Sequence, residues 1–244
     1  MLKRNSLAVA AAASLLAFAG VATADYKGGH GDDVAKVVAK AKTMAAYNYV
    51  DYTTMGSKEL AEHITLKTGS YKSGDDQMGG KTTQRLVQDE LQKICTDLRG
   101  KPTDGATYAK INEMAKATIK YPEGGIKLGD WKKGRELAWS GFGWRVGHKD
   151  DDHSKKETGA NCYNCHQLAT DRTGGSIGPE LTGYGKTRGN SPEMIKYAYE
   201  VIYNPHSYFA CTYMPRMGAN GVLNQEQISH ILAYLFDPES PVNK

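Results

Sequence analysis

The stretch Cys162-Tyr163-Asn164-Cys165-His166 decides how the rest of this 244-residue sequence is interpreted. Two cysteines separated by two residues and followed at once by histidine are the pattern of covalent c-type haem attachment. Two thiols on one turn can add to the two vinyl groups of a haem, and the adjacent imidazole then lies where it can bind the iron. We therefore predict one haem c per chain, held by Cys162 and Cys165, with His166 as the proximal iron ligand.

The same pattern has two other interpretations, a zinc half-site and a chance disulfide loop. Zinc needs a second pair of cysteine or histidine ligands at suitable spacing, and the sequence has no second Cys-x-x-Cys. A separate metal site is conceivable in the polar segment 141–160, which holds two histidines and three consecutive aspartates. We interpret that segment as a solvated loop.

The N-terminus is typical of a secretory signal peptide. Residues 1–4 are cationic, residues 7–21 are apolar, and Ala22-Thr23-Ala24 supplies an A-x-A cleavage site. The apolar run is shorter than the roughly 20 residues of a spanning helix. We expect residues 1–24 to be removed by cleavage after Ala24, which leaves a periplasmic chain without a membrane span.

Charge gives little reason to expect a polyanionic partner. The formal net charge of +4 falls to +2 once Lys3 and Arg4 leave with the signal peptide. A nearly balanced chain has no strong attraction to nucleic acid or to an anionic membrane surface. Neither is predicted as a partner.

Two cysteines lie outside the haem motif, Cys95 and Cys211. An even number in an oxidising compartment favours a disulfide between them, although two free thiols or an intermolecular bond are alternatives. The bond would tie the N-terminal region to the haem region. Closing a loop of more than about 100 residues is worth on the order of 4–5 kcal/mol, less any strain.

The spacing of apolar residues predicts an all-α chain, without a convincing strand pattern. Helices are expected over residues 32–50, 57–65, 82–98 and 104–120, with later helices that begin after Asp130, Ser191 and Asn224. Asp130 and Ser191 are predicted N-caps, and Asn224 with Gln227 predicts a capping box. We divide the chain into the signal peptide, an N-terminal helical extension over 25–125 and a haem domain over 126–244.

The sixth iron ligand must come from a residue that can fold over the other haem face. Met214 and Met217 both lie in a loop before the last helix. A thioether sulfur is a soft iron ligand, and His/Met ligation raises the reduction potential relative to two histidines. We predict Met214, because Pro215 stiffens the loop that presents its sulfur. Met217, His206 and an open site are the alternatives.

Several segments together resemble a class I cytochrome c: residues 131–138, 162–166, 178–183, 214–215 and 231–235. The resemblance implies that the first and last helices of the domain cross near the haem, with Gly134 against Tyr234. It also implies that the Pro179 carbonyl accepts a hydrogen bond from Nδ1–H of His166, which fixes the ring and tunes its donor strength.

A closer resemblance is to SoxX, the monohaem subunit family of the SoxAX cytochromes of thiosulfate oxidation. It covers roughly residues 85–243, whereas residues 25–80 have no counterpart. The matching stretches are 159–167, 178–186, 203–206, 211–218 and 238–243. The Cys-Thr-x-Met-Pro-Arg run that begins at Cys211 is specific, since ordinary class I cytochromes lack it.

The SoxX resemblance implies a function as one subunit of a heterodimeric L-cysteine S-thiosulfotransferase. A SoxA-type partner, whose haem has a cysteine ligand, oxidatively joins thiosulfate to a cysteine of the SoxYZ carrier. The SoxX-type haem takes up the electrons and passes them to a downstream cytochrome c. No catalytic residue is expected in this chain.

Two other functions stay open from the sequence. The first is a generic soluble periplasmic electron carrier, whose basic residues near the haem segments would steer an acidic partner: Arg172, Lys186, Arg188 and Arg216. The second is a ligand-sensing or peroxidatic haem protein with an open sixth site.

Overall fold

The computed structural model describes residues 52–67, 76–77, 80–81, 87–98, 100–144 and 152–244. The chain divides into two compact units, Met1–Leu60 and Ala61–Lys244. The predicted signal peptide and the predicted helix over 32–50 lie outside the described residues. The domain boundary between residues 125 and 126 stays a prediction.

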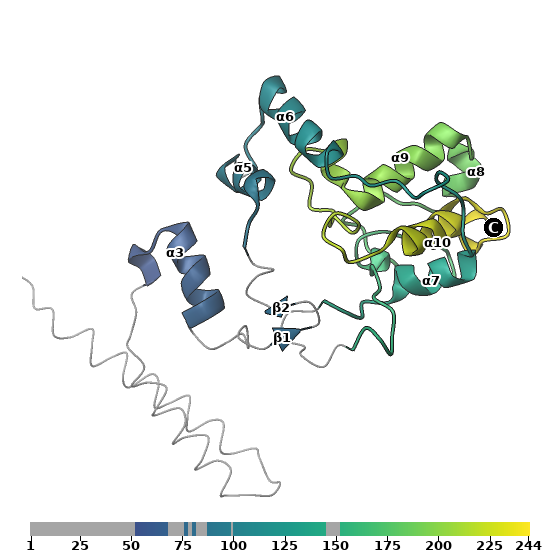
Figure 1. The fold of residues 1–244 in the computed structure, drawn as a ribbon, viewed down its shortest axis with the longest axis horizontal. Helices are drawn as coiled ribbons and strands as arrows, with labels where there is room; N and C mark the ends of the chain where they lie inside the picture. Colours follow the sequence, from purple (N-terminus) through teal and green to yellow (C-terminus); the bar gives the residue numbers. More distant parts are fainter. Residues whose placement is uncertain (1–51, 68–75, 78–79, 82–86, 99, 145–151) are drawn as a thin grey trace, which may run out of the picture. The chain divides into compact units, whose positions relative to one another are not determined.

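Helices dominate the described part of the chain (Figure 1). The early elements are η1 (Tyr52–Thr54), α3 (Ser57–Glu62), the π-helical turn η2 (His63–Lys67), α5 (Glu90–Leu98) and α6 (Gly105–Lys116). The later ones are α7 (Trp131–Trp139), η3 (Cys162–Asn164), α8 (Tyr184–Arg188), α9 (Pro192–Tyr203), η4 (Pro205–Ser207), α10 (Gln225–Phe236) and η5 (Pro241–Asn243). The strands of the described residues are two antiparallel pieces of two residues each, β1 (Asp76–Gln77) and β2 (Gly80–Lys81). The described part of the chain is therefore helical, as predicted, with one short antiparallel strand pair that the sequence pattern did not indicate.

Helices α7 and α10 pack directly on each other and form the centre of the core (Figure 1). A Cβ atom on Gly134 of α7 would lie 1.9 Å from the carbonyl oxygen of His230 in α10, so glycine allows the two backbones to touch. The nearest atoms to that position belong to His230 and Ile231, one turn before Tyr234. The structure thus places the α10 backbone at His230 and Ile231 nearest to Gly134, and the expected contact between Gly134 and Tyr234 stays a prediction.

The predicted helix starts after residue 130 are confirmed by their hydrogen bonds. The Asp130 carboxylate accepts from the Lys132 N–H at 2.7 Å, and the Ser191 hydroxyl accepts from the Met194 N–H at 3.3 Å. Asn224 and Gln227 exchange both bonds of a capping box. These caps satisfy N–H groups that have no partner within the helix.

Helix α5 begins later than its apolar spacing predicts. The expected helix over 82–98 included Val87, but that side chain is 73% exposed and lies before the helix. The Asp89 carboxylate accepts from the Gln92 N–H at 2.8 Å, and the Gln92 side chain accepts from the Asp89 N–H at 3.1 Å. This reciprocal cap starts the helix at Glu90. The helix expected over 104–120 is α6, which starts after its N-cap Asp104 and ends at Lys116, four residues earlier than predicted.

A buried carboxylate holds the segment after α9 in place. Glu200 of α9 is 7% exposed and accepts hydrogen bonds from the phenols of Tyr121 and Tyr208. Desolvation and the Glu200 carboxylate raise the pKa of Tyr121 to about 12. The two phenols satisfy a charge that would otherwise be costly to bury.

The contact at Gly134 generates a stability prediction. Replacing Gly134 by alanine forces α7 and α10 apart, and we expect the free energy of unfolding to fall by about 3 kcal/mol. Gly105→Ala is the matched control, because nothing lies within 4 Å of its added Cβ. Urea unfolding monitored by circular dichroism measures both. Equal unfolding midpoints for the two variants would contradict the close helix contact.

Candidate haem-attachment site

Both motif cysteines lie on one tight turn. The carbonyl of Cys162 accepts from the backbone N–H groups of Cys165 at 3.1 Å and His166 at 2.9 Å. Both cysteines are free thiols of intermediate exposure. The turn therefore presents two sulfur atoms and an imidazole within five consecutive residues.

The ring of His166 is held by the segment that follows it. Its Nδ1 lies 2.7 Å from the Pro179 carbonyl oxygen. A carbonyl can only accept, so Nδ1 carries the proton and Nε2 keeps its lone pair for a metal. A Cβ on Gly178 would lie 2.3 Å from Cε1 of His166, so the backbone of Gly178 packs directly against the ring.

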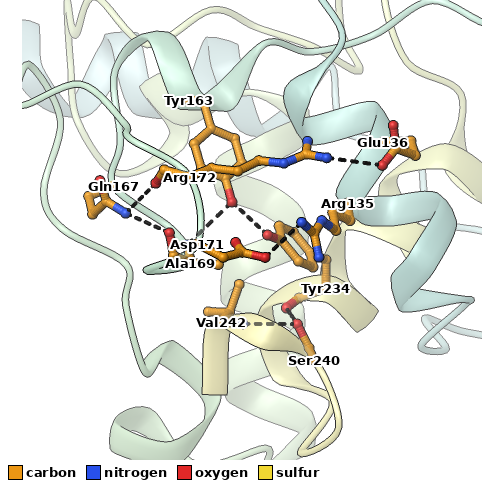
Figure 2. Close-up of polar contacts among 10 residues, drawn as sticks. All are labelled: Arg135, Glu136, Tyr163, Gln167, Ala169, Asp171, Arg172, Tyr234, Ser240 and Val242. Carbon is orange, nitrogen blue, oxygen red and sulfur yellow. Dashed lines mark hydrogen bonds and ion pairs between the residues drawn. The ribbon is translucent and has the colours of Figure 1, made fainter. Parts of the chain in front are cut away.

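Tyr163, between the two cysteines, anchors the motif in the core (Figure 2). It is 4% exposed, and its hydroxyl lies 2.6 Å from the Tyr234 hydroxyl of α10. The same oxygen accepts from the Ala169 N–H at 3.3 Å. The Tyr163 ring meets the Trp139 ring of α7 edge to face, with centroids 5.3 Å apart. The motif is thus fixed against both central helices.

The loop after the motif is closed by Gln167 (Figure 2). Its amide donates to the carbonyls of Ala169 at 2.7 Å and Arg172 at 2.9 Å, and its oxygen accepts from the Gly174 N–H at 2.7 Å. An ion pair between Arg135 and Asp171 at 2.7 Å ties this loop to α7.

Sequence reasoning missed the roles of Tyr163 and Gln167, because the partner of Tyr163 is 71 residues away. The Cys-x-x-Cys-His pattern carries no information on the two intervening positions. The three hydrogen bonds of Gln167 fall within seven residues, but such an amide has no sequence signature of its own.

The surroundings of the Cys162 thiol fit an uncharged sulfur. Desolvation raises the pKa of Cys162 to about 12, so its thiol is neutral at pH 7. Thioether bonds to a haem suit such a site better than the thiolates that zinc requires. Among the residues that the structure describes, no cluster of three or more His, Cys, Asp or Glu side chains could hold a metal ion.

The predicted sixth ligand lies in the loop between η4 and α10. Met214 and Met217 are both partly buried and pack against the main core. The Met217 carbonyl accepts from the N–H groups of Val222 at 2.9 Å and Leu223 at 3.1 Å, so its backbone belongs to a closed turn. Met214 lies outside that turn, next to the exposed ring of Pro215. The choice of Met214 over Met217 stays a prediction.

His206, an alternative ligand, makes a contact inside the same loop. Its Nδ1 accepts from the Cys211 N–H at 3.0 Å, and the residue is 7% exposed. Desolvation and the nearby Arg216 charge lower the pKa of His206, against the opposing effect of Asp89. The ring is therefore neutral at pH 7, with one nitrogen used as a hydrogen-bond acceptor.

The structure joins Cys95 of α5 to Cys211 by a disulfide across a sequence separation of 116. Close to it, Arg216 Nη1 lies 2.6 Å from an Asp89 carboxylate oxygen. Burial opposes the ionisation of Asp89, but the Gln92 N–H and Arg216 outweigh it and lower the pKa of Asp89.

The four basic residues proposed for partner steering differ in their surroundings. Arg216 is 8% exposed and paired with Asp89, so it is not part of a free basic surface. The guanidinium of Arg172 lies over the Trp139 ring at 4.7 Å. Lys186 and Arg188 are exposed.

Part of the polar segment 141–160 lines an open pocket of about 350 Å³. Its walls are formed by Trp144, His153, Glu157, Thr158, Gly221, Val222, Asn224 and Gln227. His148, Asp150 and Asp151 lie outside the described residues. No helix among the described residues has the length and apolar character to cross a membrane.

Comparison with known proteins gives one informative relative. The chain is 43% identical over 160 residues to an uncharacterized lipoprotein of Aquifex aeolicus (strain VF5). The match spans 65% of this chain and 74% of the relative. No protein-family model matches the chain. The chain belongs to the same family as that lipoprotein.

Gly178 provides a direct test of how His166 is held. Gly178→Ala should displace the imidazole and break its bond to the Pro179 carbonyl, so Nδ1–H should exchange with solvent rapidly. NMR of 15N-histidine-labelled protein detects that proton. Ile177→Ala, a neighbouring change at a side chain that is 78% exposed, should leave it protected. A protected Nδ1–H in Gly178→Ala would refute the packing of Gly178 on the ring.

Proposed function

We propose that this chain is a c-type cytochrome whose haem is attached to Cys162 and Cys165 and whose iron is bound by His166 and Met214. The observation that carries the proposal is the His166 imidazole, oriented by the Pro179 carbonyl directly after two thiols on one turn. Its Nε2 keeps the lone pair that an iron ligand needs. When bound, the haem would supply a centre that stores one electron.

The surrounding architecture supports a class I cytochrome c domain over residues 126–244. Helices α7 and α10 pack in backbone contact at Gly134, and the motif sits against both of them through Tyr163. The Met214 loop leads into α10, the last of the long helices. Residues 25–125 form the proposed N-terminal helical extension.

Two protein ligands on the iron would restrict it to electron transfer. An iron bound by both His166 and Met214 has no open position for a substrate. Electron transfer then needs little rearrangement at the iron, whereas a sensor or peroxidase needs an open site. The chain's own residues hold and orient the centre, and we assign no catalytic residue to it.

Within electron transfer, the function we propose is the SoxX-type subunit of a thiosulfate-oxidising L-cysteine S-thiosulfotransferase. Joining thiosulfate to a cysteine thiol forms a sulfur–sulfur bond and releases two electrons and one proton. A SoxA-type haem subunit would host that step on the SoxYZ carrier, and this chain would pass the electrons singly to a downstream cytochrome c. The support is the run from Cys211 to Gly218, whose cysteine is bonded to α5.

The proposed location is the periplasm, after cleavage at Ala24. Support comes from the signal-like residues 1–24 and from the relative, whose description as a lipoprotein is that of an exported protein. An oxidising compartment also suits the disulfide between Cys95 and Cys211.

Purification from the periplasm of cells grown on thiosulfate tests the proposed partner. We expect the chain to carry the added mass of one haem and to co-purify with a larger haem protein. The haem should be reduced only when this partner, thiosulfate and the carrier are all present, because the sulfur chemistry occurs outside this chain. Visible absorption of the reduced haem measures the reaction.

The controls separate the alternatives. A monomeric chain that exchanges electrons with an oxidase, and whose rate falls steeply with salt, would identify a generic electron carrier instead. Binding of carbon monoxide to the reduced native protein would identify an open iron site. A chain without covalent haem would refute the whole proposal.

A further inference from the structure

We propose that α5 holds the sixth iron ligand in place, and that Asp89 and Cys95 are positioning residues for Met214. This inference rests on the proposed function, since it concerns the ligand that Met214 provides. It assigns a role to an N-terminal helix for which the sequence indicated none. The Met214 loop is defined here as residues 208–217.

Two links, one from α5 and one from its cap Asp89, attach the Met214 loop, the first before Met214 in the sequence and the second after it. The disulfide joins Cys95 to Cys211, three residues before Met214. The ion pair joins Asp89 to Arg216, two residues after Met214, at 2.6 Å. Because Cys95 lies in α5 and Asp89 caps the start of that helix, the two links fix the ends of the six-residue segment 211–216 relative to each other.

The backbone of the loop has little other long-range support. Between residues 208 and 216, the backbone–backbone hydrogen bonds that the structure describes join residues at most four positions apart. Past Met217 the situation changes, because Val222 and Leu223 bond to the Met217 carbonyl and Gly218 packs on the Tyr203 ring. The segment that presents Met214 therefore depends on side-chain attachments.

The hydrogen bonds that side chains of α6 and α9 make to the loop reach only its start. The Tyr108 hydroxyl donates to the Tyr208 carbonyl at 2.5 Å, and Glu200 accepts from the Tyr208 phenol. Both contacts are six residues before Met214. The attachments nearest to the ligand are those from α5.

The backbone conformation of Cys211 is one that its disulfide helps to maintain. Its φ is +58°, in the left-handed region that residues other than glycine seldom adopt. The disulfide and the bond from its N–H to His206 hold it there. Without the disulfide, the backbone three residues before Met214 is free to move to a commoner conformation.

The ion pair is not an ordinary surface salt bridge. Arg216 is 8% exposed although the Asp89 side chain is 50% exposed, and it is pairs with both partners exposed that contribute little to stability. Removing the Asp89 charge leaves a buried guanidinium without its partner, which is unfavourable in the closed arrangement of the loop. The loop can relieve this only by moving Arg216 toward water, and Met214 is two residues away.

The test uses the haem-loaded protein and three variants. Asp89→Asn removes the charge but retains a side-chain oxygen that can cap α5. The double variant Cys95→Ser with Cys211→Ser removes the disulfide. Glu90→Gln is the matched control, because it removes the neighbouring charge of the same helix, whose pair with Lys110 at 3.4 Å is exposed.

We expect added imidazole to displace Met214 from the ferric iron at a concentration about tenfold lower or more in Asp89→Asn and in the double variant. The Met-to-iron charge-transfer band reports the displacement. Amides of residues 212–214, 216 and 217 should exchange hydrogen faster in both variants. Glu90→Gln should match the unmodified protein in both measurements.

The outcomes distinguish this inference from the proposed function. If the unmodified protein lacks the band, the ligand assignment fails, and Met214 positioning fails with it. If the band is present but imidazole displaces it equally in Asp89→Asn and Glu90→Gln, the positioning role of α5 is overturned alone. Should the double variant fail to fold, Asp89→Asn decides the question.

Discussion

The hydrogen bond from His166 Nδ1 to the Pro179 carbonyl is the constraint on which the proposed chemistry depends. It sets the tautomer, and the tautomer determines which ring nitrogen can bind iron. The contact also explains the glycine before the proline, since a side chain at residue 178 would occupy the space of the ring. One short segment thus specifies the direction, the tautomer and the packing of His166, the proposed proximal ligand.

The two proposed iron ligands are held in different ways. His166 is oriented by a backbone group only 13 residues away, on a turn that Tyr163 fixes against the central helices. Met214 lies in a loop whose nearest attachments come from α5, more than 100 residues earlier. The position of His166 therefore depends on nearby residues in the sequence, whereas that of Met214 depends on contacts between distant parts of the chain.

This difference explains what could be predicted from the sequence. The caps at Asp130, Ser191 and Asn224 were predictable because a cap and its partners lie within three residues. The start of α5 was missed since the reciprocal cap of Asp89 and Gln92 overrides the apolar spacing before it. The sequence indicated Arg216 as a basic residue that could steer a partner, whereas in the structure it is paired with Asp89. Contacts across a hundred residues leave no periodic trace in a single sequence.

The optical spectrum of the ferric protein tests the proposed centre most directly, by comparing the unmodified chain with Met214→Gly. The unmodified protein should carry covalent haem with a Met-to-iron charge-transfer band, and the variant should retain the haem but lose the band. Survival of the band in Met214→Gly would assign the sulfur ligand to Met217. Absence of haem from the unmodified protein would contradict the proposed function altogether.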